Sequence, residues 1–324
     1  MTTTTDLAIQ AHDLRCAYGS YEAVRGIDLE IRAGEMFALL GTNGAGKTTT
    51  METLEGHRRA SGGSLSVLGH DPHAERARVR PRLGIMLQES GFAGELTVAE
   101  TIDMWLALSS SPLGEKHRRA GTVAEAMERL DLTDRAGTRV VQLSGGQKRR
   151  LDLVLATVTR PDLVFLDEPT TGLDPESRRR TWDLIETLRG SGTTIVLTTH
   201  YLEEAERLAD RIAIMHAGRI AVEGTLAELV DDRPTRISFR RPEDVSSDAI
   251  DRALRTVVGP RRLEMVGSEG LMLDVVDAQQ ALGRLLGWAD AHGHRLDNIT
   301  VSQASLSDVF AQIASGENEQ EELV

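Results

Sequence analysis

The sequence predicts an α/β fold over roughly its first 231 residues, followed by a small α+β domain. Short apolar runs, at residues 36–40 and 163–166 for example, alternate with segments of helical pattern, as in parallel sheets covered by helices. A glycine-rich loop follows the first of these runs. From residue 235 the pattern changes to shorter strands and amphipathic helices. The 324 residues therefore predict two domains, at 1–231 and 235–315.

The glycine-rich loop reads Gly-Thr-Asn-Gly-Ala-Gly-Lys-Thr at residues 41–48. It fits the phosphate-loop pattern G-x-x-x-x-G-K-[ST] and lies between an apolar strand and a helix-like segment. Backbone N–H groups of such a loop face phosphate oxygens. Lys47 is expected to reach the β- and γ-phosphates, and the Thr48 hydroxyl to bind Mg²⁺. The residues expected to contact ATP here are Gly41, Thr42, Asn43, Gly44, Ala45, Gly46, Lys47, Thr48 and Thr49.

A second apolar run ends in two carboxylates, Asp167 and Glu168, before a sharp turn at residues 169–172. Two adjacent acids are usually a solvated strand end, but here four apolar residues precede them directly. Parallel sheets bind ligands beyond the carboxyl ends of their strands. Asp167 is therefore expected to bind Mg²⁺, and Glu168 to polarise the attacking water.

A third motif, Leu143-Ser144-Gly145-Gly146-Gln147, precedes a segment of helical pattern. Ser144 suits the N-cap position, and the N-terminal amides of a helix attract anions. With the phosphate loop about a hundred residues earlier, this motif strongly resembles the signature of ATP-binding-cassette (ABC) transporter subunits. The resemblance covers residues 1–231 and implies a P-loop NTPase cassette with a RecA-like core, an antiparallel β subdomain and an α-helical subdomain at about 89–159.

The resemblance implies roles for two residues at strand ends. His200 follows a β-rich run and corresponds to the switch histidine, which contacts the γ-phosphate. Gln88 follows another apolar run and corresponds to the Q-loop glutamine, which contacts Mg²⁺ or the attacking water. The expected catalytic residues are thus Lys47, Gln88, Glu168 and His200, and the expected Mg²⁺ ligands are Thr48, Gln88 and Asp167.

Two more residues acquire roles in the same way. Tyr18 corresponds to the aromatic residue that stacks on adenine, although an aromatic residue in an edge strand is often a packing residue. Tyr21 is the alternative. Asp174 lies in the equivalent of the D-loop, which crosses the interface between two cassettes; its alternative is an Asp-Pro turn before a helix at residues 176–189.

The signature implies a dimer, because in this family it faces the γ-phosphate held by the other subunit. One motif set is present, so two copies of this chain are expected to enclose two ATP and two Mg²⁺. The other implied partner is an integral membrane permease. Its coupling helix would dock near Glu89, Ser90 and Phe92, although Phe92 can equally be a packing residue.

Composition excludes several classes of protein. The net charge of −13 gives no reason to expect nucleic-acid binding. No apolar stretch approaches the length that spans a bilayer, and the N-terminus lacks a signal pattern. The expected location is cytoplasmic, peripheral on the inner face of the membrane through the permease. The single cysteine, Cys16, excludes an intrachain disulfide.

The region from residue 235 shows no catalytic pattern. It resembles the extra C-terminal domain of drug-exporter cassettes, for which a dimer-stabilising or regulatory role is the hypothesis. Its expected strands are 236–240, 262–266, 271–276 and 298–303, and its expected helices are 247–258, 278–292 and 306–313. Residues 316–324 are expected to form an acidic, disordered tail.

These features together favour the ATPase subunit of a drug or antibiotic exporter, similar to the daunorubicin-resistance type. Two alternatives stay open. The same ATP-gated dimer could serve a regulator that takes no part in transport, or the chain could belong to an importer. The sequence does not identify the cargo, because the permease is expected to select it.

Overall fold

The computed structural model describes residues 7–87, 91, 93–109, 127–128, 132–231, 234–242, 245–259, 262–266 and 270–315. The chain divides into two compact units, Met1–Leu226 and Ala227–Val324, which are described separately. This division assigns nearly all of helix α8 (Leu226–Asp231) to the second unit, whereas the expected boundary at residue 231 places it in the first. The expected boundaries at 231 and 235 remain a prediction.

The first unit is built around a six-stranded sheet with the order β5-β6-β7-β3-β8-β9. The strands are β3 (Met36–Gly41), β5 (Leu83–Met86), β6 (Leu163–Asp167), β7 (Thr194–Thr198), β8 (Arg211–His216) and β9 (Arg219–Gly224). Every pair is parallel except β8 with β9. Side chains of β3 and β7 are buried throughout, as expected for central strands covered on both faces. The parallel strands therefore deliver their carboxyl ends to one edge of the sheet.

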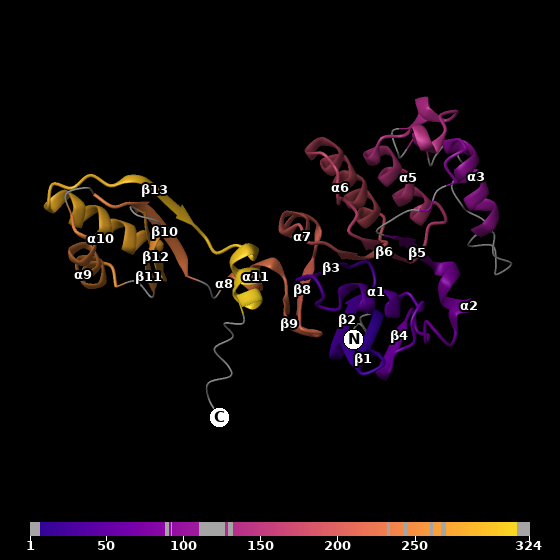
Figure 1. Ribbon diagram of the computed structural model, residues 1–324, viewed down its shortest axis with the longest axis horizontal. Helices are drawn as coiled ribbons and strands as arrows, with labels where there is room; N and C mark the ends of the chain where they lie inside the picture. Colours follow the sequence, from indigo (N-terminus) through magenta and orange to yellow (C-terminus); the bar gives the residue numbers. More distant parts are fainter. Residues whose placement is uncertain are drawn as a thin grey trace, which may run out of the picture. The chain divides into compact units, whose positions relative to one another are not determined.

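Helices cover this sheet and follow its strands (Figure 1). α1 (Lys47–Leu54) follows β3, and the short helix α2 (Arg76–Val79) continues into a 3₁₀ turn (Arg80–Arg82) before β5. α6 (Pro175–Gly190) follows β6, and α7 (Leu202–Leu208) follows β7. The apolar side of α6, including Trp182 and Ile185, is buried. The expected strand–loop–helix order around the glycine-rich loop is confirmed.

A three-stranded antiparallel sheet, in the order β2-β1-β4, completes the core of this unit. It consists of β1 (Leu7–Tyr18), β2 (Tyr21–Arg32) and β4 (Gly62–Val67). Its buried face shares one apolar core with α1 and with strands β3, β5 and β6. The expectation that Tyr18 lies in an edge strand is wrong, because β1 is the central strand. The pairing of β1 with β4 ends at Arg15, however, so Tyr18 pairs with β2 alone.

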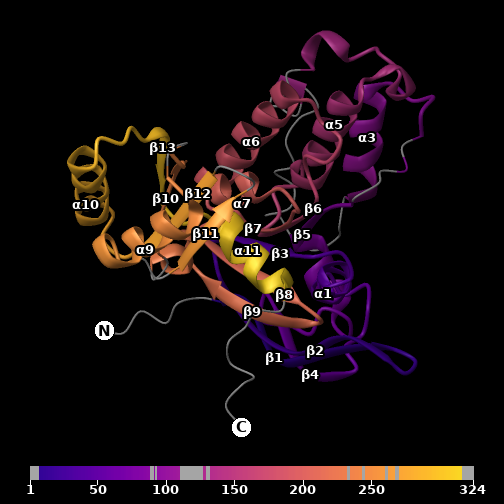
Figure 2. The ribbon, with the colours of Figure 1, turned by 60° about the vertical axis from the view of Figure 1, so that its left-hand side comes forward.

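A helical segment contains α3 (Val98–Ser109) and α5 (Gly145–Thr157), and α5 lies beside α6 (Figures 1 and 2). Two 3₁₀ turns, Thr133–Arg135 and Val140–Gln142, precede α5. A separate apolar core joins α3 to α5, with Ile102 and Leu151 fully buried. The sequence pattern Thr-x-x-Glu at residues 97–100 predicts a capping box, and the structure confirms it, since Thr97 and Glu100 exchange hydrogen bonds. The pattern also predicts a helix at residues 122–130, which lies almost entirely outside the described residues.

The second unit contains a four-stranded antiparallel sheet with the order β11-β12-β10-β13. Its elements are β10 (Thr235–Arg240), α9 (Ser247–Val257), β11 (Arg262–Val266), β12 (Gly270–Val275), α10 (Ala278–Ala291), β13 (Asp297–Ser302) and α11 (Leu306–Ser315). α9 and α10 pack on one face of the sheet around a core that includes Leu254, Leu273 and Leu285 (Figures 1 and 2). The secondary structure expected here is confirmed to within two residues at each end. The expected acidic tail lies outside the described residues.

Candidate nucleotide-hydrolysis site

The glycine-rich loop joins β3 to α1 with a backbone that glycine permits. Gly46, the N-cap residue of α1, has a φ of 103°, which is strained for any residue with a side chain. A Cβ atom there would lie 2.6 Å from the carbonyl oxygen of Ala23. The turn is therefore fixed by close packing of loop backbone against β2. It leaves the N-terminus of α1 open for an anion.

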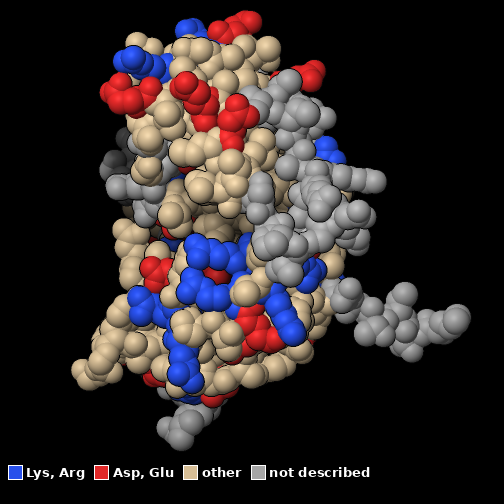
Figure 3. All heavy atoms as spheres, turned by 90° about the vertical axis from the view of Figure 1, so that its right-hand side faces the viewer, with Lys and Arg blue, Asp and Glu red and all other residues tan. Residues whose placement is uncertain are grey.

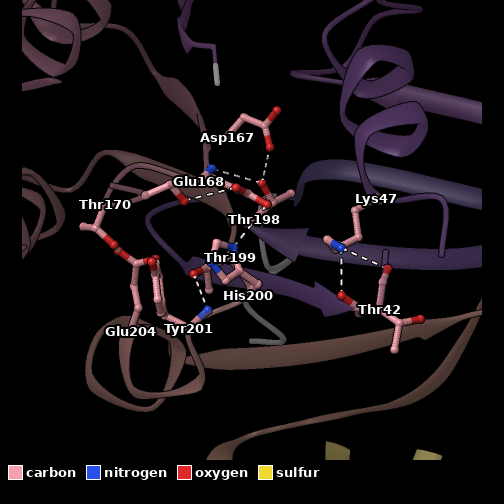
Figure 4. A network of polar contacts seen from close by, with 12 residues as sticks. Thr42, Lys47, Asp167, Glu168, Thr170, Thr198, Thr199, His200, Tyr201 and Glu204 are labelled. Carbon is pink, nitrogen blue, oxygen red and sulfur yellow. Dashed lines mark hydrogen bonds and ion pairs between the residues drawn. The ribbon is translucent and has the colours of Figure 1, made fainter. Parts of the chain in front are cut away.

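Lys47 lies in the first turn of α1 and is 9% exposed. Its Nζ donates hydrogen bonds to the carbonyl oxygens of Gly41 at 2.7 Å and Thr42 at 3.2 Å (Figure 4). Burial lowers the pKa of Lys47, and the negative charges of Glu168 and Asp167 oppose that shift. The structure thus places the Lys47 ammonium group in the field of both expected carboxylates.

Asp167 and Glu168 are held at the end of β6 by the neighbouring strand β7. One carboxylate oxygen of Asp167 accepts a hydrogen bond from the Thr198 hydroxyl. The Glu168 N–H donates to the Thr198 carbonyl oxygen at 3.0 Å. Glu168 has a φ of 48°, a left-handed conformation that is uncommon for a residue with a side chain. This backbone turns the Glu168 side chain away from the direction of the strand.

The Glu168 carboxylate lies near His200 at the ends of two strands (Figure 4). The Nδ1 atom of His200 lies 3.3 Å from one carboxylate oxygen, and the Thr171 hydroxyl donates to the other at 3.1 Å. His200 follows β7 and Glu168 follows β6, which are adjacent and parallel. Adjacent strands therefore bring together two of the four expected catalytic residues. Gln88 lies outside the described residues, as do Glu89, Ser90 and Phe92.

Tyr18 contacts the phosphate-loop helix. Its hydroxyl lies 3.3 Å from the hydroxyl of Thr49, and the Arg58 guanidinium carbon lies 4.0 Å from the centre of its ring. The side chain is 45% exposed, so an aromatic surface remains beside α1. The alternative, Tyr21, is also exposed. The adenine-stacking role stays a prediction, and the contact with Thr49 favours Tyr18 over Tyr21.

The signature forms the start of α5. Ser144 accepts a hydrogen bond from the Gln147 N–H at 3.3 Å and donates its own N–H to the Gln147 side chain at 2.9 Å. The expected N-cap is thus confirmed as part of a capping box. A Cβ atom on Gly146 would lie 2.7 Å from the hydroxyl oxygen of Ser177, so α5 approaches α6 closely at this point.

Asp174 is the N-cap residue of α6, with Pro175 in the first helical position. It accepts hydrogen bonds from the N–H groups of Glu176 and Ser177 and from the Ser177 hydroxyl. A helix thus follows the Asp-Pro pair, as the Asp-Pro interpretation predicts. The interface role stays a prediction. The signature and Asp174 are neighbours within one chain. Among the described residues, no hydrogen bond or ion pair joins the signature to the loop at 41–49.

Sequence analysis missed two buried charged residues near this site. Arg149 hydrogen-bonds to the carbonyl oxygens at the ends of β5 and β6. Glu204, on α7, accepts a hydrogen bond from the Thr170 hydroxyl at 2.9 Å (Figure 4). It also accepts one from the Trp182 indole at 2.9 Å. Burial raises the pKa of the Glu204 carboxyl group. The available signal was helical spacing, since Arg149 shares a buried stripe with Leu153.

The donor groups at this edge suit Mg²⁺. Thr48 exposes its hydroxyl, and Asp167 carries a carboxylate oxygen beyond the one that accepts from Thr198. Mg²⁺ binds through one or two such oxygens together with phosphate and water, without an all-protein cage. In the part of the chain that the structure describes, no three His, Cys, Asp or Glu side chains form a metal-binding cluster. Thr48 and Asp167 provide oxygen donors of the kind that Mg²⁺ binds.

Comparisons with known proteins agree with this geometry. The sequence model described as "ABC transporter" matches residues 24–171, and "ABC transporter domain-containing protein-like, C-terminal domain" matches residues 235–305. Daunorubicin resistance ATP-binding protein DrrA3 of Streptomyces coeruleorubidus is 36% identical, over 95% of this chain and 96% of the relative. Nod factor export ATP-binding protein I of Paraburkholderia xenovorans is 36% identical, over 96% and 98%. A solved structure of an "ATP binding subunit of ABC transporter" has a TM-score of 0.61 at 27% identity, covering 69% of this chain and 92% of that one.

The fold and the site define a P-loop ATPase that carries a cassette signature. With 36% identity to relatives over nearly the full length of both chains, the chain belongs to the ATP-binding proteins of the ABC transporter family. The expected cassette fold and the expected ATPase activity are those of this family. None of the helices in the described residues is long and apolar enough to cross a membrane.

Proposed function

We propose that this protein couples ATP hydrolysis to the export of a drug or antibiotic through a separate membrane permease. One observation carries the catalytic part of the proposal. Glu168 leaves β6 in a left-handed conformation, and its carboxylate contacts His200 and Thr171 within the field of Lys47. A held carboxylate beside a phosphate-binding lysine is suited to orient and deprotonate a water molecule.

Each residue of the site has a distinct task in this proposal. Lys47 exchanges its contacts with the loop carbonyls for the β- and γ-phosphates. Thr48 and Asp167 would hold Mg²⁺, which supplies charge neutralisation between the phosphates when bound. Glu168 accepts a proton from the attacking water, and His200 keeps the Glu168 carboxylate in place. Tyr18 offers its ring to the adenine.

We propose that two copies of the chain enclose two ATP molecules. The signature at the start of α5 presents the N–H groups of Gly145 and Gly146 at the helix N-terminus, and these would meet the γ-phosphate bound by the other copy. ATP then stabilises the closed dimer, and hydrolysis releases it. The unit beyond residue 235 would stabilise or regulate this dimer. Deletion of residues 235–324 should weaken assembly, and an unchanged complex would contradict that role.

The permease would dock on the face that carries α2 and α3, at the cytoplasmic side of the membrane. On this face, Lys and Arg side chains gather in the lower half around a few Asp and Glu side chains, and the top carries charges of both signs (Figure 3). Arg76 and Arg80 are exposed there, on α2 and in the 3₁₀ turn that follows it. Because the whole chain has a net charge of −13, this patch would attract an acidic permease segment that the rest of the surface repels.

Export is favoured over the alternatives by the names of the relatives. One relative is a daunorubicin resistance protein and another a Nod factor export protein, and each matches over nearly its full length. The two names refer to different compounds. The proposal therefore names a class of cargo, a drug or antibiotic, and no particular compound. The rival proposal of a non-transport regulator would use the same ATP site, so partner identity separates the two.

The test is a capture experiment with tagged Glu168→Gln protein and detergent-solubilised membranes of the source cell. A stoichiometric multi-helix membrane protein, retained in ATP and less in ADP, is the expected result. Recovery of soluble partners alone would favour the regulator. The docking face is tested by Arg76→Glu with Arg80→Glu, which should weaken capture. The matched control, Arg32→Glu with Arg219→Glu, changes two exposed arginines elsewhere in the unit and should capture normally.

A further inference from the structure

Arg149 is a buried arginine that donates four hydrogen bonds to backbone carbonyl groups. It lies on α5, five residues after Ser144, and is 8% exposed. Its Nε donates to the carbonyl oxygen of Pro169 at 3.0 Å. One Nη donates to the carbonyl of Leu87 at 2.7 Å, and the other to the carbonyls of Asp167 at 2.6 Å and Glu168 at 2.7 Å. One side chain thus holds the ends of two adjacent strands, β5 and β6.

These acceptors belong to the segments that carry the chemistry. Leu87 directly precedes the expected Q-loop glutamine, Gln88, and the other three acceptors run from Asp167 to Pro169. Glu168 has a left-handed backbone with a φ of 48°, which persists only where neighbouring contacts enforce it. The Arg149 contact fixes the Glu168 carbonyl, while Thr198 fixes its N–H. Together they determine the direction of the Glu168 side chain.

Four contacts of Arg149 go to carbonyl oxygens of the two strand ends. The Asp152 carboxylate, one turn further along α5, lies 4.0 Å from the guanidinium. A planar fork of five N–H donors suits such a set of acceptors, and a lysine ammonium group does not.

We propose that Arg149 is a positioning residue that couples the signature helix to the reactive carboxylate of the same chain. This inference rests on the proposed function, in which the signature meets the partner's ATP while Glu168 acts on the chain's own ATP. α5 begins at the signature, and Arg149 is its link to Glu168. A movement of α5 on nucleotide binding is thereby transmitted to the backbone of Glu168. Arg149 touches neither nucleotide nor water in this scheme.

The experiment compares kcat and KM for ATP in wild type, Arg149→Met and Arg149→Lys. Misplacing a reacting group by about 1 Å costs on the order of 100-fold in rate, so kcat should fall by about that factor in Arg149→Met. KM should change little, because the residues expected to contact ATP are intact. Arg149→Lys keeps the charge and should recover part of the loss, and it also serves if Arg149→Met fails to fold.

The matched control is Arg211→Lys. Arg211 also lies largely buried, donating to the carbonyl of Glu30 at 2.9 Å and to Glu35 at 3.0 Å, but at the amino end of β8, away from the site. Arg211→Lys should lower the thermal midpoint of unfolding as much as Arg149→Lys does, but it should leave kcat nearly unchanged. Equal losses of kcat in the two variants would reduce Arg149 to a structural residue and overturn the proposal.

A double-mutant cycle with Glu168→Gln tests the route of the effect. If Arg149 acts through Glu168, adding Arg149→Lys to Glu168→Gln should lower the residual single-turnover rate by less than about 2-fold. Independent, multiplicative losses would overturn the proposal. A second cycle with Ser144→Ala should be non-additive in the same way, because the signal enters α5 there. If Glu168→Gln hydrolysed ATP at the normal rate, the proposed function would fail. If Glu168→Gln were inactive and the two substitutions had additive effects, only the proposed coupling through Arg149 would be refuted.

Discussion

The protonation of the buried residue Glu55, at the end of the phosphate-loop helix, can be tested directly by its effect on stability. It caps the C-terminus of α1 and is 8% exposed. Burial raises the pKa of its carboxyl group from 4.5 to about 8, and the negative charges of Asp167 and Glu52 add to that shift. Its Oε2 atom lies 3.0 Å from Nδ1 of His57. Burial and the charges of Arg80 and Arg76 lower the pKa of His57, so a neutral carboxyl and a neutral imidazole are paired near pH 7.

The sign of the pH dependence follows from this shift. Between pH 4.5 and about 8 the folded chain keeps the Glu55 proton that the unfolded chain has released. The stabilisation is complete below pH 4.5 and is lost as the pH rises through about 8. One proton corresponds to a slope of at most about 1.4 kcal/mol per pH unit. Glu55→Gln is neutral at every pH and should remove this part of the slope.

The assay is urea unfolding of wild type and Glu55→Gln at intervals from pH 5 to 9. The difference in unfolding free energy should change with pH in favour of the variant, and most of the change should occur between pH 5 and 8. Other carboxyl groups with raised pKa, such as Asp152, contribute to both proteins and cancel in the difference. Parallel curves for the two proteins over this range would refute a buried, neutral Glu55.

Three further predictions concern the site directly. Lys47→Ala should fold but bind ATP about 10- to 100-fold more weakly by equilibrium titration, because charged hydrogen bonds to phosphate are lost; unchanged affinity would contradict its role. Gly46→Ala should lower the thermal midpoint more than Gly44→Ala, since a Cβ at Gly46 would meet the Ala23 carbonyl at 2.6 Å whereas one at Gly44 meets nothing within 4 Å; equal midpoints would count against the packing argument. Ser144→Ala should cost about 1 kcal/mol of stability in denaturant unfolding through loss of the helix cap, and no loss would show that the cap is unimportant.

Much of this fold could be predicted because local patterns determine it. The phosphate loop is bounded by a fully apolar strand and a helix start, and Ser144 caps a helix as its sequence context predicts. The elements of the second unit alternate clearly between strand and helix patterns. The order of strands in the sheet could not be predicted from local patterns, because β3 lies between β7 and β8, which are far from β3 in the sequence. The central place of β1 was missed for the same reason.

The sequence predicted the site residues that directly follow apolar strands. It did not predict the residue that contacts the site through backbone carbonyl groups. Asp167, Glu168 and His200 follow apolar runs, and parallel pairing then brings them to one edge. Arg149 gave a weaker signal, since a charged residue within a basic run appears solvated until the strand-end carbonyls are placed around it. The left-handed backbone of Glu168 likewise depends on Thr198, thirty residues away along the chain.

The most direct test of the account is a single-turnover experiment with γ-labelled ATP and Mg²⁺ on wild type and Glu168→Gln. We predict that both bind ATP with similar affinity, and that phosphate release from Glu168→Gln is slower by about 10²- to 10⁴-fold, as expected when a general base is lost. Phosphate release at the wild-type rate from Glu168→Gln would contradict the catalytic role assigned to the end of β6.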